Sequence, residues 1–253
     1  MRTWKSSTLL LPPLLLLLLL VLSSLPAAAQ AKLEKLPALK DTSVPAAIRA
    51  ALDASGSRLV RPDGSVLCEI WLRKSLPVGR VAAAKGAAYP EMSESALLGV
   101  ISFPNGGKDF RGQAIKPGLY TMRYELLPED GNHMGVSPTR DFVLLLAASA
   151  DNDPDAQYDF AQLVKLSAQA AGTNHPAPFV LLAPENNPTP SASLRAGSIA
   201  PNPGSDKGGA TAASSESRTY QNPDGFQVFA GAIQTDGGKN VPIALVVKGQ
   251  AEQ

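Results

Sequence analysis

Cysteine is almost absent, since the chain of 253 residues has only Cys68. A single cysteine excludes an intramolecular disulfide, so the fold must be held together by its apolar core. Cys68 also lies far from the N-terminal apolar segment, which excludes a lipid-modified cysteine at a cleavage site there. We expect Cys68 itself to be an inert core residue, because burial disfavours the thiolate form.

An excess of one charge is missing as well. Basic residues number 23 and acidic residues 22, which gives a net charge of +1. This balance carries no electrostatic footprint for nucleic acid or for an anionic membrane, so we expect neither as a partner. Beyond residue 29, no apolar run approaches the ~20 residues that a membrane-spanning helix needs. We therefore expect no membrane span once the N-terminal segment is removed.

That N-terminal segment carries the one clear targeting pattern. Arg2 and Lys5 supply a positive start, Leu14–Leu22 is an unbroken apolar run, and three alanines follow. This order predicts a Sec-type signal peptide over residues 1–29, with cleavage after Ala29. The expected location is secreted or periplasmic. Loss of the two positive residues lowers the basic count from 23 to 21, against 22 acidic residues.

Most of the remaining chain predicts antiparallel β-structure. Apolar and polar side chains alternate between Ser65 and Arg73, which is the period of a strand. Asn, Asp and Gly turn signals separate further strand patterns. These patterns cover Leu97–Phe103, Leu119–Leu126, Arg140–Leu146, Phe179–Leu182, Phe226–Gln234 and Val241–Val247. We predict a mainly β chain that folds as an antiparallel β-sandwich.

One or two peripheral helices are expected beside the sheets. Residues 44–52 predict a short helix with Pro45 in its first turn, where a missing N–H costs little. A longer helix is predicted to begin with Asp153 as N-cap and Pro154 at the first helical position. Gly172 is its natural end.

From Pro184 to Arg218 the sequence is rich in Pro, Ser, Gly, Ala and Asn, with few large apolar residues. Such a stretch cannot bury enough surface to order itself, so we predict a long disordered insertion over residues 184–218. The last predicted strand is largely apolar and should return to the core. Residues 30–253 are therefore expected to form a single domain, with residues 31–40 as a polar lead-in.

The segment Ile115-Lys116-Pro117-Gly118-Leu119-Tyr120-Thr121-Met122 places a Pro-Gly turn directly before a strand. It resembles the strand entry of prealbumin-like and immunoglobulin-like β-sandwich modules. The export signal, this strand and the late apolar strand are together similar to uncharacterised exported bacterial proteins of unknown function. These resemblances imply a β-sandwich fold, and they bring no catalytic residue with them.

The most polar cluster is the loop of residues 130–135 with the adjoining pair Arg140-Asp141, which lies between two strong strand patterns. Loops on a rigid scaffold often carry function. Within this loop, His133 with Asp130 or Asp141 suits a metal ligand pair or a general base, since histidine titrates near neutrality. The structural alternatives are that the loop is an ordinary turn and that His175 caps or satisfies carbonyl groups at the end of the preceding helix. The candidate ligand-binding residues are Asp130, Asn132, His133, Arg140, Asp141 and His175.

Other catalytic patterns are missing from the sequence. It has no Gly-x-Ser-x-Gly turn, and Asn105-Gly106-Gly107-Lys108 lacks the strand–loop–helix setting of a phosphate loop. The acidic run Asp151–Asp155 fails the EF-hand spacing at its sixth and twelfth positions, so helix capping is the preferred explanation.

We favour an exported, non-catalytic binding or structural module of the cell envelope or extracellular space, with no cofactor. Its ligand is an unknown protein or small molecule. The alternative is a metal-dependent or acid/base enzyme that uses His133, His175 and Asp141.

Overall fold

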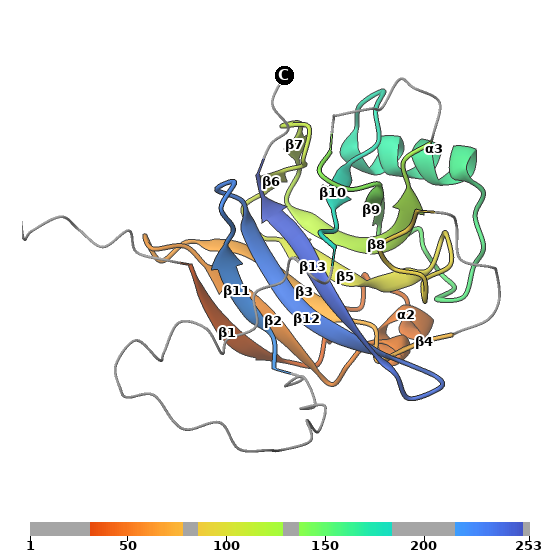
Figure 1. Ribbon diagram of the computed structural model, residues 1–253, viewed down its shortest axis with the longest axis horizontal. Coiled ribbons are helices and arrows are strands. Elements are labelled where there is room, and N and C mark those ends of the chain that lie inside the picture. The colour runs from red at the N-terminus through yellow and green to blue at the C-terminus, as the bar shows by residue number, and fades with distance from the viewer. Residues whose placement is uncertain (1–30, 78–85, 129–136, 184–215, 250–253) are drawn as a thin grey trace, which may run out of the picture. The chain divides into compact units, whose positions relative to one another are not determined.

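Two β-sheets lie face to face across an apolar core, as the sequence predicts for a mainly β sandwich (Figure 1). The computed structural model describes residues 31–77, 86–128, 137–183 and 216–249, and every structural statement below concerns these residues. The predicted signal peptide and most of the predicted insertion lie outside them.

The larger sheet has seven strands in the order β1-β2-β3-β5-β8-β9-β10, and all neighbours are antiparallel. Its strands are β1 (Lys32–Pro37), β2 (Ser55–Val60), β3 (Val66–Leu72), β5 (Leu97–Phe103), β8 (Gly118–Leu126), β9 (Asp141–Ala147) and β10 (Pro178–Val180).

The smaller sheet pairs β12 (Gln227–Thr235) with β13 (Asn240–Lys248) and with β11 (Arg218–Gln221), all antiparallel. Directly after β3, the chain crosses into this sheet as β4 (Ser75–Leu76), which pairs with β12 in parallel. In Figure 1 the blue strands β12 and β13 lie in front of the orange and yellow strands of the larger sheet. A separate short hairpin joins β6 (Gly107–Lys108) to β7 (Ala114–Ile115).

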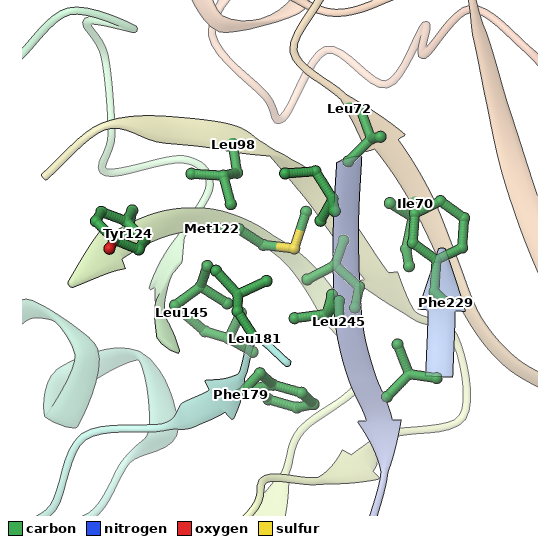
Figure 2. Close-up of a cluster of buried hydrophobic side chains, with 14 of the residues drawn as sticks. Ile70, Leu72, Leu98, Met122, Tyr124, Leu145, Phe179, Leu181, Phe229 and Leu245 are labelled. Carbon is green, nitrogen blue, oxygen red and sulfur yellow. The ribbon is translucent and has the colours of Figure 1, made fainter. Parts of the chain in front are cut away.

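Alternation along the strands creates the core between the sheets. In β8, Tyr120, Met122 and Tyr124 belong to the main apolar cluster, to which Phe229 and Leu245 of the smaller sheet also contribute (Figure 2). Each large apolar side chain buried in this way contributes about 1.5–3 kcal/mol. Cys68 is fully buried in the same cluster, where burial raises the pKa of its thiol. It is the core residue that the sequence predicts.

Two helices cover the opposite face of the larger sheet. The first, α2 (Ala46–Ala51), buries Ile48 in a cluster with Trp71 and Val100. The second, α3 (Phe160–Ala171), packs Leu163 against alternate apolar side chains of β9. The larger sheet is thus apolar on both faces, which accounts for the continuous apolar run in β9.

The start of α3 corrects the sequence prediction. Its N-cap is Asp159 rather than Asp153: the Asp159 carboxylate accepts from the Gln162 N–H (2.8 Å), and the Gln162 side chain accepts from the Asp159 N–H (3.0 Å). This is a complete capping box. The helix ends at Gly172 in the left-handed conformation (φ 69°), as predicted.

One side of the sandwich is closed by backbone pairing. Beyond β10 the chain leaves β9 and reaches β13, where Leu181 bridges to Leu245 and the Leu182 N–H donates to the Ala244 carbonyl (2.9 Å). On the opposite side, β1 and β11 are the outermost strands of their sheets. Backbone hydrogen bonds therefore join the two sheets at β10–β13, whereas within the described residues no strand pairing joins β1 to β11.

Both of these outermost strands differ from expectation. The predicted polar lead-in, residues 31–40, contains β1, and the predicted insertion extends too far, because Arg218 begins β11. Residues 184–215 lie outside the described part of the chain. Within that described part, no helix combines the length and apolar character needed to cross a membrane.

Candidate functional site

The structure separates the candidate residues that it describes. Asp130, Asn132 and His133 lie outside the described residues. Asp141 is the first residue of β9 and is 1% exposed. His175 is exposed after the end of α3, at the opposite end of β9 from Asp141.

Strand register fixes this separation. Pro178 pairs with Leu144, and the Leu145 N–H donates to the Ala177 carbonyl (3.2 Å), so His175 lies level with Ala147. Six residue steps along a strand span about 20 Å. Asp141 and His175 therefore do not share a site. In the described residues, no group of three His, Cys, Asp or Glu side chains is arranged to hold a metal ion.

Asp141 is instead the centre of a buried hydrogen-bond cluster. Its carboxylate accepts from the Ala88 N–H (3.0 and 3.1 Å) and from the Tyr124 hydroxyl (2.6 Å). Burial, and then the bond to Asp141, raise the pKa of Tyr124. Neighbouring Tyr89 donates to the Leu182 carbonyl (2.6 Å) and accepts from the Ala244 N–H (3.2 Å). This cluster ties the two sheets together and offers no open position to a ligand.

Arg140 and His175 have local backbone roles. The Arg140 guanidinium donates to the Leu127 carbonyl from two nitrogens (3.1 and 3.0 Å), which links the ends of β8 and β9. Around His175, the Thr173 hydroxyl donates to the His175 carbonyl (2.7 Å). At the end of α3, the Gln169 and Ala168 carbonyls accept from the N–H groups of Gly172 and Thr173, so these two carbonyls have partners other than His175.

A buried ion pair was not anticipated from the sequence. Arg123 and Asp151 bond through two contacts (2.8 and 2.6 Å), and both side chains have no exposed surface. Arg123 also donates to the carbonyls of Ser95 (3.0 Å), Asp153 (2.6 Å) and Ala156 (3.2 Å). The acidic run before α3 therefore binds arginine and does not cap the helix. The sequence does carry one signal of this ion pair: Arg123 is a charged residue between the apolar core residues Met122 and Tyr124 of β8.

A pocket opens at one end of the sandwich, where the β2–β3 turn, the β5–β6 turn and the end of β13 meet. We call it the end pocket, and its volume is about 550 Å³. This lies within the 300–1,000 Å³ that is usual for small-molecule sites. It is lined by Arg61, Leu67, Phe103, Asn105, Gly106, Gly107, Lys108, Val247, Lys248 and Gly249.

The end pocket combines an apolar floor with positive charge. Among the described residues, its lining includes three cationic side chains and no acidic one. Arg61 is held in place by the Ser65 hydroxyl (3.1 Å) and the Val66 carbonyl (3.2 Å). Asp63 lies in the same turn, and its pKa is lowered chiefly by hydrogen bonds from Ser65, with a smaller contribution from the charge of Arg61. Lys108 and Lys248 are exposed and form no ion pair with a described residue.

A second hollow lies between β1–β2 and β11–β12. We call it the seam groove, and its volume is about 560 Å³. Apolar side chains from both sheets form its floor, and charged ones stand at its edge. The lining residues are Leu33, Glu34, Lys35, Asp53, Ser55, Gly56, Ser57, Ile70, Leu72, Glu216, Ser217, Phe229 and Ala232.

Comparison with known proteins adds no relative: no family model, no curated protein and no solved structure matches this chain.

Proposed function

We propose that this chain is an exported, non-catalytic binding module whose end pocket takes a small amphiphilic anion. The observation that supports the proposal is the combination of an apolar floor with three cationic side chains, in a lining whose described residues include no acid. An apolar body would cover the floor, and a carboxylate head would lie among the cations. The composition of residues 1–29 supports the export step.

The apolar floor of the end pocket consists of buried, well-packed side chains. Leu67, Phe103 and Val247 are each less than 5% exposed, and the Phe103 ring packs against Phe179 with centroids 5.6 Å apart. Gly107 lies flat against this floor, since a Cβ there would be 2.8 Å from a Phe103 ring carbon. Because so little of these three side chains is exposed, the apolar body of a ligand would gain chiefly by removing its own surface from water, at roughly 25 cal/mol per Å².

Binding of decanoate tests the proposal, with decanol as the uncharged comparison. Titration calorimetry of the protein is expected to show saturable binding of decanoate, and weaker binding of decanol. The double variant Lys108→Gln/Lys248→Gln should raise the Kd for decanoate roughly tenfold, because each solvent-facing charge pair contributes up to about 1 kcal/mol. Added salt should weaken decanoate binding and leave decanol unaffected.

The matched control is Lys40→Gln/Lys165→Gln, which removes two exposed lysines outside the end pocket. Its Kd for decanoate should equal that of the unaltered protein. Equal affinity for decanoate and decanol, or a loss as large in the control as in the pocket variant, would show that the end pocket does not select an anion.

Export is tested separately by the mass of the protein. Expressed in a bacterium with a Sec pathway, the chain is expected outside the cytoplasm with Gln30 as its first residue, as intact-mass measurement would reveal. The variant Leu17→Arg/Leu18→Glu interrupts the apolar run and should leave the full chain in the cytoplasm. Recovery of an uncleaved, cytoplasmic wild-type chain would refute the export step without bearing on the pocket.

A further inference from the structure

The three cations of the end pocket are not equivalent. Lys108 and Lys248 are exposed, whereas Arg61 is half-buried at the β2–β3 turn. Burial raises the pKa of the Cys68 thiol, and the charge of Arg61 opposes that rise, so the guanidinium lies within electrostatic reach of the buried core. A partly desolvated cation bonds an anion more strongly than a fully hydrated one, because water competes with it less. Arg61 is therefore the cation best placed to bind a ligand directly.

The β2–β3 turn holds the Arg61 side chain in one orientation. The Arg61 backbone N–H donates to the Ser65 carbonyl (2.8 Å), which closes the turn. The Ser65 hydroxyl donates to the Asp63 carboxylate (2.6 Å), so its oxygen is left to accept from Arg61 Nη1 (3.1 Å). Nη1 also donates to the Val66 carbonyl (3.2 Å), which accepts from the Asn105 side chain as well (3.3 Å). The guanidinium is thus positioned by the protein before any ligand arrives.

This orientation leaves one edge of the guanidinium without a partner among the described residues. An arginine side chain has five N–H groups in a planar fork. The two on Nη1 point to Ser65 and Val66, whereas the three on Nε and Nη2 donate to no described residue. Asp63, the acid in the same turn, forms no ion pair with Arg61. Two parallel N–H groups of this kind can bond both oxygens of a carboxylate at once.

We propose that Arg61 holds and orients the ligand's head group, and that this group is a carboxylate bonded through both oxygens to Nε and Nη2. This inference rests on the proposed function of the end pocket. The alkyl chain then lies over the floor at Phe103, while Lys108 and Lys248 attract the anion from exposed positions without fixing its orientation. A head group with a single acceptor oxygen, such as an alcohol, pairs with only one of the two parallel donors.

The substitution Arg61→Lys tests this role, since lysine keeps the charge and lacks the fork. Titration calorimetry of the full chain with decanoate is expected to give a Kd roughly tenfold higher for Arg61→Lys than for the unaltered protein. The Kd for decanol should change little, because the apolar floor is intact. The salt dependence of decanoate binding should also be unchanged, since the charge is kept, whereas Lys108→Gln/Lys248→Gln should make it less steep.

A spectroscopic measurement reports the contact itself. In the ¹⁵N-labelled full chain, saturating decanoate is expected to shift the Nε–H resonance of Arg61 and to slow its exchange with water, and decanol should do neither. Ser65→Ala removes one acceptor of Nη1 and should raise the Kd for decanoate roughly threefold, because the guanidinium is then less firmly oriented. The matched control is Arg58→Lys, which alters an arginine of β2 outside the pocket lining and should leave the Kd unchanged.

The two proposals about the end pocket fail in different ways. Equal affinity of the unaltered protein for decanoate and decanol would overturn the proposed function, and the role of Arg61 with it. A preference for decanoate that Arg61→Lys leaves intact would overturn only the role of Arg61, and so would an Arg61 Nε–H resonance that decanoate does not move. The proposed function would then stand, with the two lysines as the source of the preference.

Discussion

Replacing Arg123 with methionine is expected to lower the free energy of unfolding by about 3–5 kcal/mol. The Asp151 carboxylate, which has no exposed surface, would lose its cationic partner. The carbonyls of Ser95 and Asp153 would lose their charged donor at the same time. Methionine fills much of the arginine volume, so the loss reports the unpaired polar groups more than a cavity. Urea denaturation at neutral pH measures it.

A double variant separates pairing from packing. Arg123→Met/Asp151→Leu removes both charges, and it should recover most of the stability lost in the single variant, because two apolar side chains replace a desolvated pair. The comparison pair is Arg58 with Glu69, where Arg58 is 38% exposed. Arg58→Met should cost less than about 1 kcal/mol. A cost for Arg123→Met no greater than that of Arg58→Met would mean that the buried pair is not a main contributor to stability.

Strands with one or two apolar faces were predictable from the sequence. Alternation in β3 and β8 and the continuous apolar run in β9 each reflect a period that burial imposes on the side chains. The predicted strands Leu97–Phe103 and Val241–Val247 correspond to β5 and β13. These central strands have neighbours or packing on every side, so their composition carries a strong signal.

The outermost strands were not predictable in the same way. In β1 four of six residues are exposed, and β11 has no fully buried residue. An edge strand gains its order from the ladder on one side, and a polar composition is typical there. Likewise, Asp153 satisfies the local rules for an N-cap, yet its carbonyl accepts from the buried Arg123. A contact between residues thirty positions apart overrode the local preference.

The candidate sites, like the strands, were only partly predictable from the sequence. The sequence singles out Asp141, which is a centre of buried hydrogen bonds, but no local pattern indicates that Ala88 and Tyr124 would be its partners. The end pocket and the seam groove were missed, because each is assembled from strands and turns distant in the sequence. No local motif marks such a hollow, since its character depends on the register of the sheets that surround it.

Replacing Glu125 with glutamine is expected to change how stability depends on pH. Glu125 is 2% exposed in β8, and burial, with a smaller contribution from nearby Glu94, raises its pKa to about 7, although the Leu126 N–H bonds its carboxylate. The unfolded chain loses this proton near the ordinary glutamate pKa of about 4.3. Between these two values the folded state binds the extra proton, so stability falls as pH rises from about 4.5 to about 7 and then levels off.

Glutamine stays neutral at every pH and avoids this loss. The free energy of unfolding of Glu125→Gln minus that of the unaltered protein should therefore rise by about 2–3 kcal/mol between pH 4.5 and pH 8. Burial also raises the pKa of other carboxyl groups, such as Asp109, but their contribution to the pH dependence is the same in both proteins and cancels in the difference. Urea denaturation across this range measures it. Glu34→Gln, at an exposed position, is the control and should change stability by no more than about 0.5 kcal/mol. A difference for Glu125→Gln that stays constant with pH would show that folding does not change the pKa of Glu125.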